Sequence, residues 1–261
     1  MVAIMTNYAL YLDDSGHPDD QPFVVVAGYI ASEVQWLALD TEWREVLAKF
    51  GLDLPFHMTT FMHTKYSSFK RDQILYELAS VTKKNTLFPF VYAIDVVAWK
   101  RVNNEFALEE CHGAPFAFAV RGLAKELNEW KANNLKEGEH LLTFMEQGTK
   151  HFGQMEEIFQ RDRIPALNRV PKEMVQVQPC DVLAWEAFKW LKAGSPNRPS
   201  KNMARLTNHI RVKQPLGGIF YEADIRRICA DTDVMLRSAL KPGDTIRFHS
   251  NLKRVRRRTI K

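Results

Sequence analysis

The chain has 261 residues, of which 46% are hydrophobic, and a formal net charge of +5, so it is long enough to bury one large core or one core with an appendage. The cysteines, Cys111, Cys180 and Cys229, lie far apart without a C-x-x-C pair, which argues against a structural zinc site or a redox motif and fits a cytoplasmic location. The Asp13-Asp14 pair interrupts the N-terminal apolar run well short of a membrane span, so we expect neither a signal peptide nor a transmembrane helix.

The predicted elements alternate between strands and helices along the chain. We expect strands, from apolar runs bounded by turn residues, at residues 8–12, 22–30, 88–97, 140–145 and 174–177. The first of these is apolar on both faces, which is typical of a central strand covered on both sides. We expect helices from the N-cap Ser32 to about residue 50, and at residues 71–84, 113–132, 151–161, 179–193 and 221–240. This alternation predicts a mixed α/β sheet with helices on both faces.

The composition changes at residues 194–200, a Gly-Ser-Pro-Asn-Arg-Pro-Ser segment that predicts a linker. We therefore expect a domain of residues 1–193 and a basic C-terminal extension of residues 194–261 with one or two helices. Residues 247–261 contain seven Lys or Arg and no acidic residue. Such a run predicts contacts to nucleic-acid phosphates through Lys253, Arg254, Arg256, Arg257 and Arg258. The alternative is a solvated tail without a partner.

Three acidic residues stand where a cation site is expected. Asp13 follows the first strand, Glu146 follows the strand at 140–145, and Asp181 lies in the first turn of the helix at 179–193. Sites in open α/β sheets form beyond the carboxyl ends of strands. Three converging carboxylates repel one another unless a cation such as Mg²⁺ or Mn²⁺ lies between them. Singly, each acid also has an ordinary explanation, as a turn cap, a loop acid or a favourable helix N-terminal charge.

Several segments resemble the family called domain of unknown function 3800, and the likeness covers roughly residues 8–193. The resemblance is carried by Leu10-Tyr11-Leu12-Asp13-Asp14-Ser15-Gly16, the strand at 23–30 with Trp36 and Trp43 beyond it, Phe56-His57-Met58, Phe144-Met145-Glu146 and Val177-Gln178-Pro179-Cys180-Asp181-Val182-Leu183-Ala184-Trp185. It departs from the family pattern at Asp14, where Glu is more frequent, and at Cys180, where Ala is common. Neither departure removes a proposed metal ligand.

The resemblance implies an RNase H-like fold, which we expect as a mixed five-stranded sheet flanked by helices. It implies Asp13 on the first strand, Glu146 on a neighbouring strand and Asp181 on a later helix as metal ligands. His57 falls at the family's histidine position, where it could orient a phosphate or transfer a proton; a partly buried loop histidine is the alternative.

Two further residues near these acids are candidates for supporting roles. Asp14 could serve as an outer metal ligand. Lys150 could contact a scissile phosphate, and the alternative is a solvated loop lysine.

The leading hypothesis is a Mg²⁺- or Mn²⁺-dependent nuclease that hydrolyses phosphodiester bonds in RNA or DNA with two metal ions about 3.5–4 Å apart. One alternative is a non-catalytic nucleic-acid-binding or defence-complex subunit that keeps the RNase H-like fold. Another is a hydrolase of small phosphate esters. No P-loop, G-x-G-x-x-G or G-x-S-x-G motif occurs, which argues against nucleotide-driven, dinucleotide or serine-hydrolase chemistry.

Overall fold

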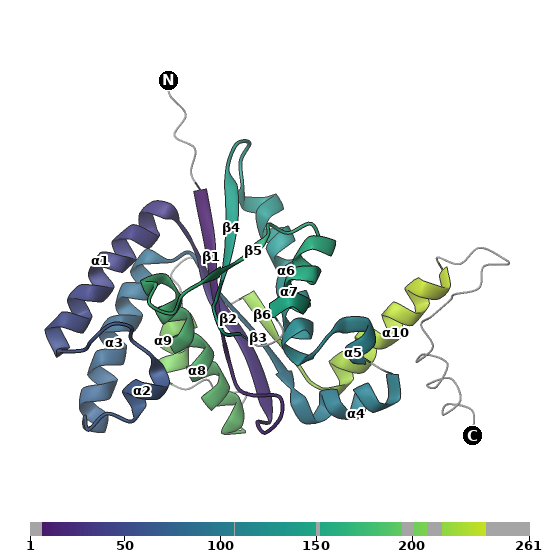
Figure 1. Cartoon of the computed structure of the whole chain (residues 1–261), viewed down its shortest axis with the longest axis horizontal. Coiled ribbons are helices and arrows are strands. Elements are labelled where there is room, and N and C mark those ends of the chain that lie inside the picture. The colour runs from purple at the N-terminus through teal and green to yellow at the C-terminus, as the bar shows by residue number, and fades with distance from the viewer. Residues whose placement is uncertain (1–6, 107, 150–151, 195–200, 208–215, 239–261) are drawn as a thin grey trace.

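The computed structural model describes residues 7–106, 108–149, 152–194, 201–207 and 216–238 (Figure 1). Its described part contains one mixed sheet of six strands in the order β5-β4-β1-β2-β3-β6. The strands are β1 (Asn7–Ser15), β2 (Phe23–Ser32), β3 (Phe88–Asp95), β4 (His140–Glu146), β5 (Leu167–Val170) and β6 (Leu216–Phe220). β1 and β3 run antiparallel to β2, β4 and β5 run parallel to β1, and β6 runs parallel to β3. β1 is thus an interior strand, as its apolar sequence predicts.

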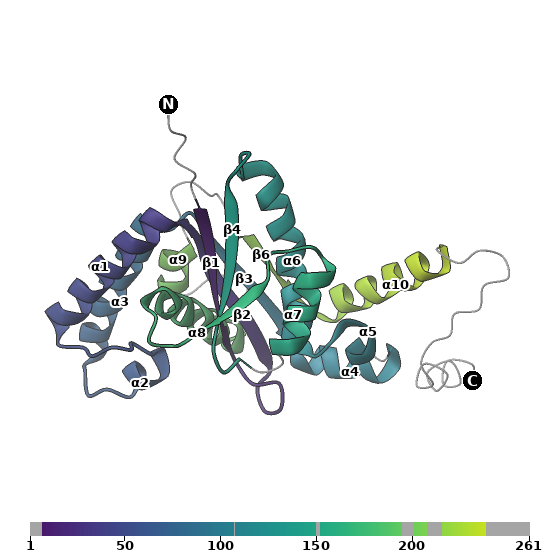
Figure 2. The ribbon, with the colours of Figure 1, turned by 45° about the horizontal axis from the view of Figure 1, so that its top comes forward.

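Helices cover both faces of the sheet, as predicted (Figures 1 and 2). One face carries α1 (Glu33–Phe50), α2 (Met58–Met62), α3 (Ser68–Asn85), α8 (Gln178–Lys192) and α9 (Lys201–Thr207). The other carries α4 (Val96–Phe106), α5 (Leu108–His112), α6 (Pro115–Asn134), α7 (Phe152–Arg161) and α10 (Glu222–Ser238). Successive strand residues point to opposite faces, so Tyr11 belongs to the core under α8, whereas Leu10 and Leu12 belong to the core under α6.

Local sequence signals explain where α1 begins and ends. Ser32 caps its N-terminus by accepting a hydrogen bond from the Gln35 backbone N–H, and the Gln35 side chain in turn accepts from the Ser32 backbone N–H. Gly51 ends the helix in the left-handed conformation, with φ of 65°, where glycine carries no steric penalty. The N-cap predicted at Ser32 is therefore confirmed.

The predicted count of five strands is wrong, because the described sheet has six. Residues 174–177 were expected as the fifth strand, but Val175–Val177 form a short 3₁₀ helix, η1, that leads into α8. A short apolar run does not distinguish a buried strand from a buried helical turn. The fifth strand is β5, whose Asn168 and Arg169 are exposed, so its sequence lacks a buried apolar run.

The sixth strand, β6, lies in the segment expected as a C-terminal extension, and it pairs with β3 at the edge of the sheet. Its Leu-Gly-Gly-Ile-Phe sequence has two glycines, which weaken the strand pattern. At Gly217 a Cβ atom would lie 1.9 Å from the Val91 carbonyl oxygen, so the close approach of β6 to β3 requires glycine there.

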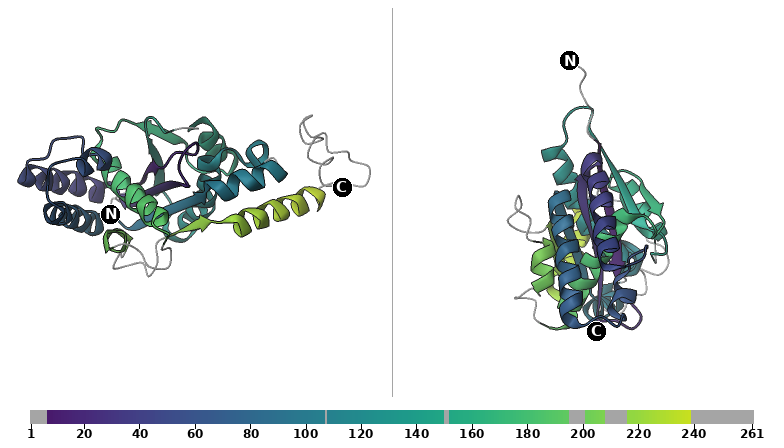
Figure 3. Two further views of the ribbon diagram at one scale, coloured as in Figure 1. Left: turned by 90° about the horizontal axis from the view of Figure 1, so that it is seen from below. Right: turned by 90° about the vertical axis from the view of Figure 1, so that its left-hand side faces the viewer.

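Helices α2, α4 and α5 were not predicted, although α4 carries buried Val96, Trp99 and Val102 at helical spacing. α10 contacts α4 along its first turns, and its C-terminal end extends beyond the other described helices (Figure 3). Every helix within the described ranges is too short or too polar to cross a membrane.

Candidate active site

The register of two parallel strands brings Asp13 and Glu146 together. β1 and β4 pair through Leu12 and Met145, so Asp13 and Glu146 are the next residues on adjacent strands, which lie about 4.8 Å apart in a sheet. Immediately before them on the same face, the rings of Tyr11 and Phe144 stack with centroids 4.7 Å apart. Both carboxylates therefore point to the face that α1 and α8 cover.

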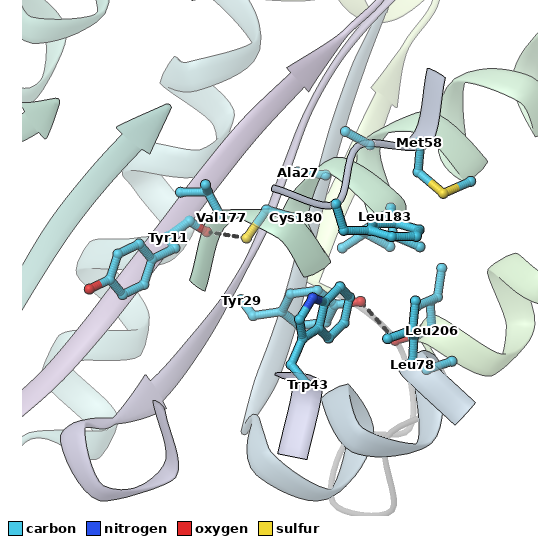
Figure 4. Packing of buried hydrophobic residues seen from close by; sticks show 14 of the residues in the cluster. Tyr11, Ala27, Tyr29, Trp43, Met58, Leu78, Val177, Cys180, Leu183 and Leu206 are labelled. Atoms are coloured by element: carbon cyan, nitrogen blue, oxygen red, sulfur yellow. Dashed lines mark hydrogen bonds between the residues drawn. The ribbon is translucent and has the colours of Figure 1, made fainter. Parts of the chain in front are cut away.

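Helix α8 supplies the third carboxylate. Pro179 lies at the start of the helix, as predicted, and Asp181 lies in its first turn, where the helix dipole favours a negative charge. The Cys180 thiol donates a hydrogen bond to the Tyr11 carbonyl oxygen, 3.2 Å away, which fixes the start of α8 on β1 (Figure 4). The Met58 backbone N–H donates to Asp181 Oδ2 at 2.6 Å, so the carboxylate is also held by the start of α2.

Asp13, Glu146, Asp181 and His57 line one pocket of about 240 Å³. The strand ends contribute the first two, α8 contributes Asp181, and the segment before α2 contributes His57. The remaining lining residues are Pro55, Phe56, Thr60, Lys172, Val177 and Gln178. All four residues predicted to be catalytic thus surround the same space.

The carboxyl groups in this cluster resist simultaneous ionisation. Burial raises the pKa of Asp13 well above its ordinary value, and the charges of Glu146 and Asp181 and a hydrogen bond with Glu146 raise it further. Burial also raises the pKa of Asp181, although His57 and the Met58 N–H oppose this shift. A divalent cation between these groups would offset both the cost of ionising buried carboxyl groups and the repulsion between them.

Asp14 is next to the pocket residue Asp13 but does not itself line the pocket. Its backbone N–H donates to Asp13 Oδ1 at 2.8 Å and so orients that carboxylate. Burial raises the pKa of Asp14 to about 6, and a hydrogen bond from Thr149 opposes the shift. This position is compatible with the outer role expected for Asp14, because a residue of this kind orients the ligands that do touch a metal.

The chemistry of these three carboxylates suits a hard cation such as Mg²⁺. Among the described residues, no group of three or more His, Cys, Asp or Glu side chains is already arranged to hold a metal ion. Instead, Glu146 is close enough to Asp13 to raise the pKa of Asp13, both through its charge and through a hydrogen bond between the two carboxyl groups. The donor set of Asp13, Glu146 and Asp181 consists of carboxylate oxygens, the ligands that Mg²⁺ prefers. Metal binding would require Asp13 to lose its proton, which would free the carboxylate oxygens that a cation needs.

The structure also identifies pocket residues that were not predicted. Lys172 is exposed at the pocket, two residues beyond the end of β5. Lys172 was missed because the fifth strand was expected at 174–177. The observed strand β5 ends at Val170, which pairs with Glu146 and so brings the following residues close to the carboxylates. Gln178 belongs to the Val177–Trp185 segment, in which no local sequence pattern assigns it a role.

The predicted nucleic-acid contacts cannot be placed. Lys150, Lys253, Arg254, Arg256, Arg257 and Arg258 lie outside the described residues. Neither a scan of protein-family models nor a search of curated proteins returned a match for this chain. Function is therefore inferred from the site itself, since a fold alone does not establish it.

Proposed function

We propose that this protein is a Mg²⁺- or Mn²⁺-dependent nuclease of the RNase H-like type that hydrolyses phosphodiester bonds in RNA or DNA. The observation that carries the proposal is that carboxylates from β1, β4 and α8 line one pocket, with Asp13 only 3% exposed and Asp181 only 8% exposed. Buried carboxylates crowded in this way destabilise the metal-free site, and cation binding explains why they lie together.

Each pocket residue has a defined task in this proposal. Asp13, Glu146 and Asp181 would hold the cations. When bound, such ions would polarise the phosphoryl group, activate the attacking water and stabilise the leaving oxygen. His57 would hold or transfer a proton beside Asp181, and Lys172 would bind a non-bridging phosphate oxygen at the exposed side of the pocket.

The fold supports the RNase H-like assignment. The resemblance implies carboxylates on the first strand, on a neighbouring strand and on a later helix, and Asp13, Glu146 and Asp181 occupy β1, β4 and α8. The additional strand β6 pairs with β3, which is separated from β1 by β2. β6 therefore does not contact the ends of β1 and β4 that carry Asp13 and Glu146, and its presence is compatible with the RNase H-like arrangement of the carboxylates.

A non-catalytic binding subunit is the main alternative, and it predicts carboxylates neutralised by Lys or Arg. No described Lys or Arg forms an ion pair with Asp13, Glu146 or Asp181. Because no Lys or Arg in the described ranges compensates the repulsion within the cluster, the catalytic proposal is favoured.

The test is incubation of labelled single-stranded, duplex and hybrid oligonucleotides with the protein in Mn²⁺ or EDTA. We expect cleavage of at least one substrate in Mn²⁺ only, and a loss of at least about 100-fold for Asp13→Asn, as for other groups that stabilise transition-state charge. The matched control is Asp72→Asn, which removes an exposed carboxylate on α3 and should keep full activity. Equal turnover by Asp13→Asn and the wild type would overturn the proposal.

A further inference from the structure

The side-chain amide of Gln178 has a fixed orientation. Gln178 is the first residue of α8 and is 2% exposed. Its Oε1 accepts hydrogen bonds from the Trp43 indole Nε1–H at 3.0 Å and from the Phe56 backbone N–H at 3.2 Å. Both partners are obligate donors, so only the carbonyl oxygen of the amide can face them. The amide therefore cannot be flipped.

This orientation leaves the other half of the amide without a partner. Gln178 Nε2 carries two N–H donors, it is buried, and it has no acceptor among the described residues. Buried polar groups in folded proteins are almost always hydrogen-bonded, so each exception needs an explanation. The acceptor for Gln178 is therefore expected to come from outside the described chain.

The location of Gln178 indicates what kind of molecule supplies that acceptor. Gln178 lines the pocket that contains Asp13, Glu146 and Asp181, and it precedes Asp181 by one helical turn on the same side of α8. An amide N–H₂ group cannot ligate a metal ion, since it has no free lone pair. Its partner must be an oxygen acceptor that enters the pocket.

We propose that Gln178 Nε2 donates a hydrogen bond to a non-bridging oxygen of the substrate phosphodiester and positions it beside the carboxylates. This inference rests on the proposed function and adds a substrate-binding residue to it. The neutral amide complements Lys172, because it donates without adding charge at the buried side of the pocket, whereas Lys172 is on the exposed side. A phosphodiester offers only acceptors to these groups, as this arrangement requires.

Two variants of the full chain remove the donor in different ways. Gln178→Glu keeps an acceptor for Trp43 and Phe56 but replaces the N–H₂ group with an oxygen. The second comparison avoids a new charge: the double variant Trp43→Phe, Gln178→Met is compared with the single variant Trp43→Phe. Because both proteins lack the Trp43 indole N–H, the added Gln178→Met substitution leaves only the Phe56 N–H without its acceptor. We expect kcat/KM to fall about 10- to 100-fold in each case, mainly through KM, as for the loss of one hydrogen bond to a charged oxygen.

A second measurement observes the amide directly. The protein is wild type, labelled with ¹⁵N and loaded with Mg²⁺, and the oligonucleotide is a nonhydrolysable one. The Gln178 side-chain amide signals are identified as those that disappear in the Gln178→Glu variant. We expect them to shift when a single-stranded oligonucleotide is added, which a purely structural glutamine would not do.

The outcomes separate this inference from the proposed function. If the wild type cleaves, but the Gln178 substitutions change KM less than twofold and the amide signals do not shift, the inference is overturned while the nuclease proposal stands. If the amide shifts with Mg²⁺ alone and no further with oligonucleotide, its partner is metal-bound water and the inference is also wrong. If the oligonucleotide shifts the amide but no metal supports cleavage, the positioning role stands and the nuclease proposal fails. If neither cleavage nor a shift occurs, both are overturned.

Discussion

Asp13 is the residue on which the site depends most. It is almost fully buried, it hydrogen-bonds with Glu146, and it receives a hydrogen bond from the Asp14 backbone N–H. A buried carboxylate next to two others is costly when ionised. The metal-free protein therefore retains protons in this cluster at a pH where exposed carboxylates have lost theirs.

This retention predicts that the metal-free protein is less stable at neutral than at acidic pH. Burial raises the folded-state pKa of Asp13 and Asp181, and that of Asp14 to about 6. Because the unfolded chain loses these protons near pH 4, the folded state binds more protons above that pH, and its stability falls as pH rises through the raised values. In EDTA we expect the melting temperature to fall by several degrees from pH 5 to pH 7.5, since one pKa unit corresponds to about 1.4 kcal/mol.

Thermal melts of the wild type and Asp13→Asn across this range measure the effect. The variant removes one buried charge, so its melting temperature should depend less on pH, and the difference between the two curves isolates the cluster from the histidines. Mn²⁺ should restore the wild type at pH 7.5 and have a smaller effect at pH 5, where protons compete. A wild-type melting temperature that rises over this interval in EDTA would contradict the account.

At this scale, the sequence could predict the carboxylates but not the amide. Asp13 and Glu146 follow apolar strands and Asp181 follows Pro179, so local pattern was sufficient to place them. The orientation of Gln178 depends on Trp43 and on Phe56, which lie 135 and 122 residues away along the chain. No local pattern reports a hydrogen bond between such distant residues.

Among the elements, β5 shows how an edge strand escapes prediction. It has four residues with buried ends and an exposed middle, so neither an alternating nor a continuous apolar pattern marks it. Its position matters for the site, because Val170 pairs with Glu146 and Lys172 follows two residues later. The end of β5 thus places the positively charged Lys172 in the same pocket as the carboxylates.

The position of Lys172 at the end of β5 predicts a phosphate contact. We expect Lys172→Ala to weaken oligonucleotide binding about 3- to 10-fold and to lower the slope of log K against log salt by about one. Lys100→Ala is the matched control, because Lys100 is an exposed lysine on α4, across the sheet. Titration of labelled oligonucleotide by fluorescence anisotropy at several salt concentrations measures both quantities. An unchanged slope for Lys172→Ala would show that this lysine does not bind phosphate.

A hydrogen bond between β2 and helix α9 predicts an effect on stability rather than on activity. The Tyr29 hydroxyl on β2 donates to the Leu206 carbonyl oxygen at 3.4 Å (Figure 4), which is among the last carbonyls of α9 and lacks a partner within the helix. Tyr29→Phe should lower the free energy of unfolding by about 1 kcal/mol. Urea denaturation measures this change, and nuclease activity should be unaffected. A variant as stable as the wild type would mean that this contact does not anchor α9.

In the whole molecule, the described residues after 194 belong to the same folded unit as the rest of the sheet. β6 extends the sheet beyond β3, and α10 is joined to α4 by ion pairs between Arg226 and Glu105 and between Arg101 and Glu222. These pairs are exposed and contribute little stability. The mixed sheet with helices on both faces was predictable from the alternation of elements, whereas β6 was not, because its pairing with β3 spans more than a hundred residues.

The basic run at residues 247–261 remains a prediction about the whole molecule, since it lies outside the described residues. Truncation after residue 246 removes seven cations. It should therefore weaken binding of long oligonucleotides and make that binding less sensitive to salt, with kcat unchanged because the pocket is intact. Comparison of truncated and full-length protein on short and long substrates tests this, and equal affinities for the long substrate would exclude a role for the run.

The proposed chemistry requires that Asp13, Glu146 and Asp181 together bind a divalent cation. The most direct measurement is anomalous diffraction from crystals of the full chain soaked in Mn²⁺. We expect a manganese peak within coordination distance of these three carboxylates, with no hydrogen bond between Asp13 and Glu146, and no such peak in Asp13→Asn. The proposed metal site would be wrong if a Mn²⁺-soaked wild-type crystal showed no metal among the three carboxylates and a hydrogen bond still joining Asp13 and Glu146.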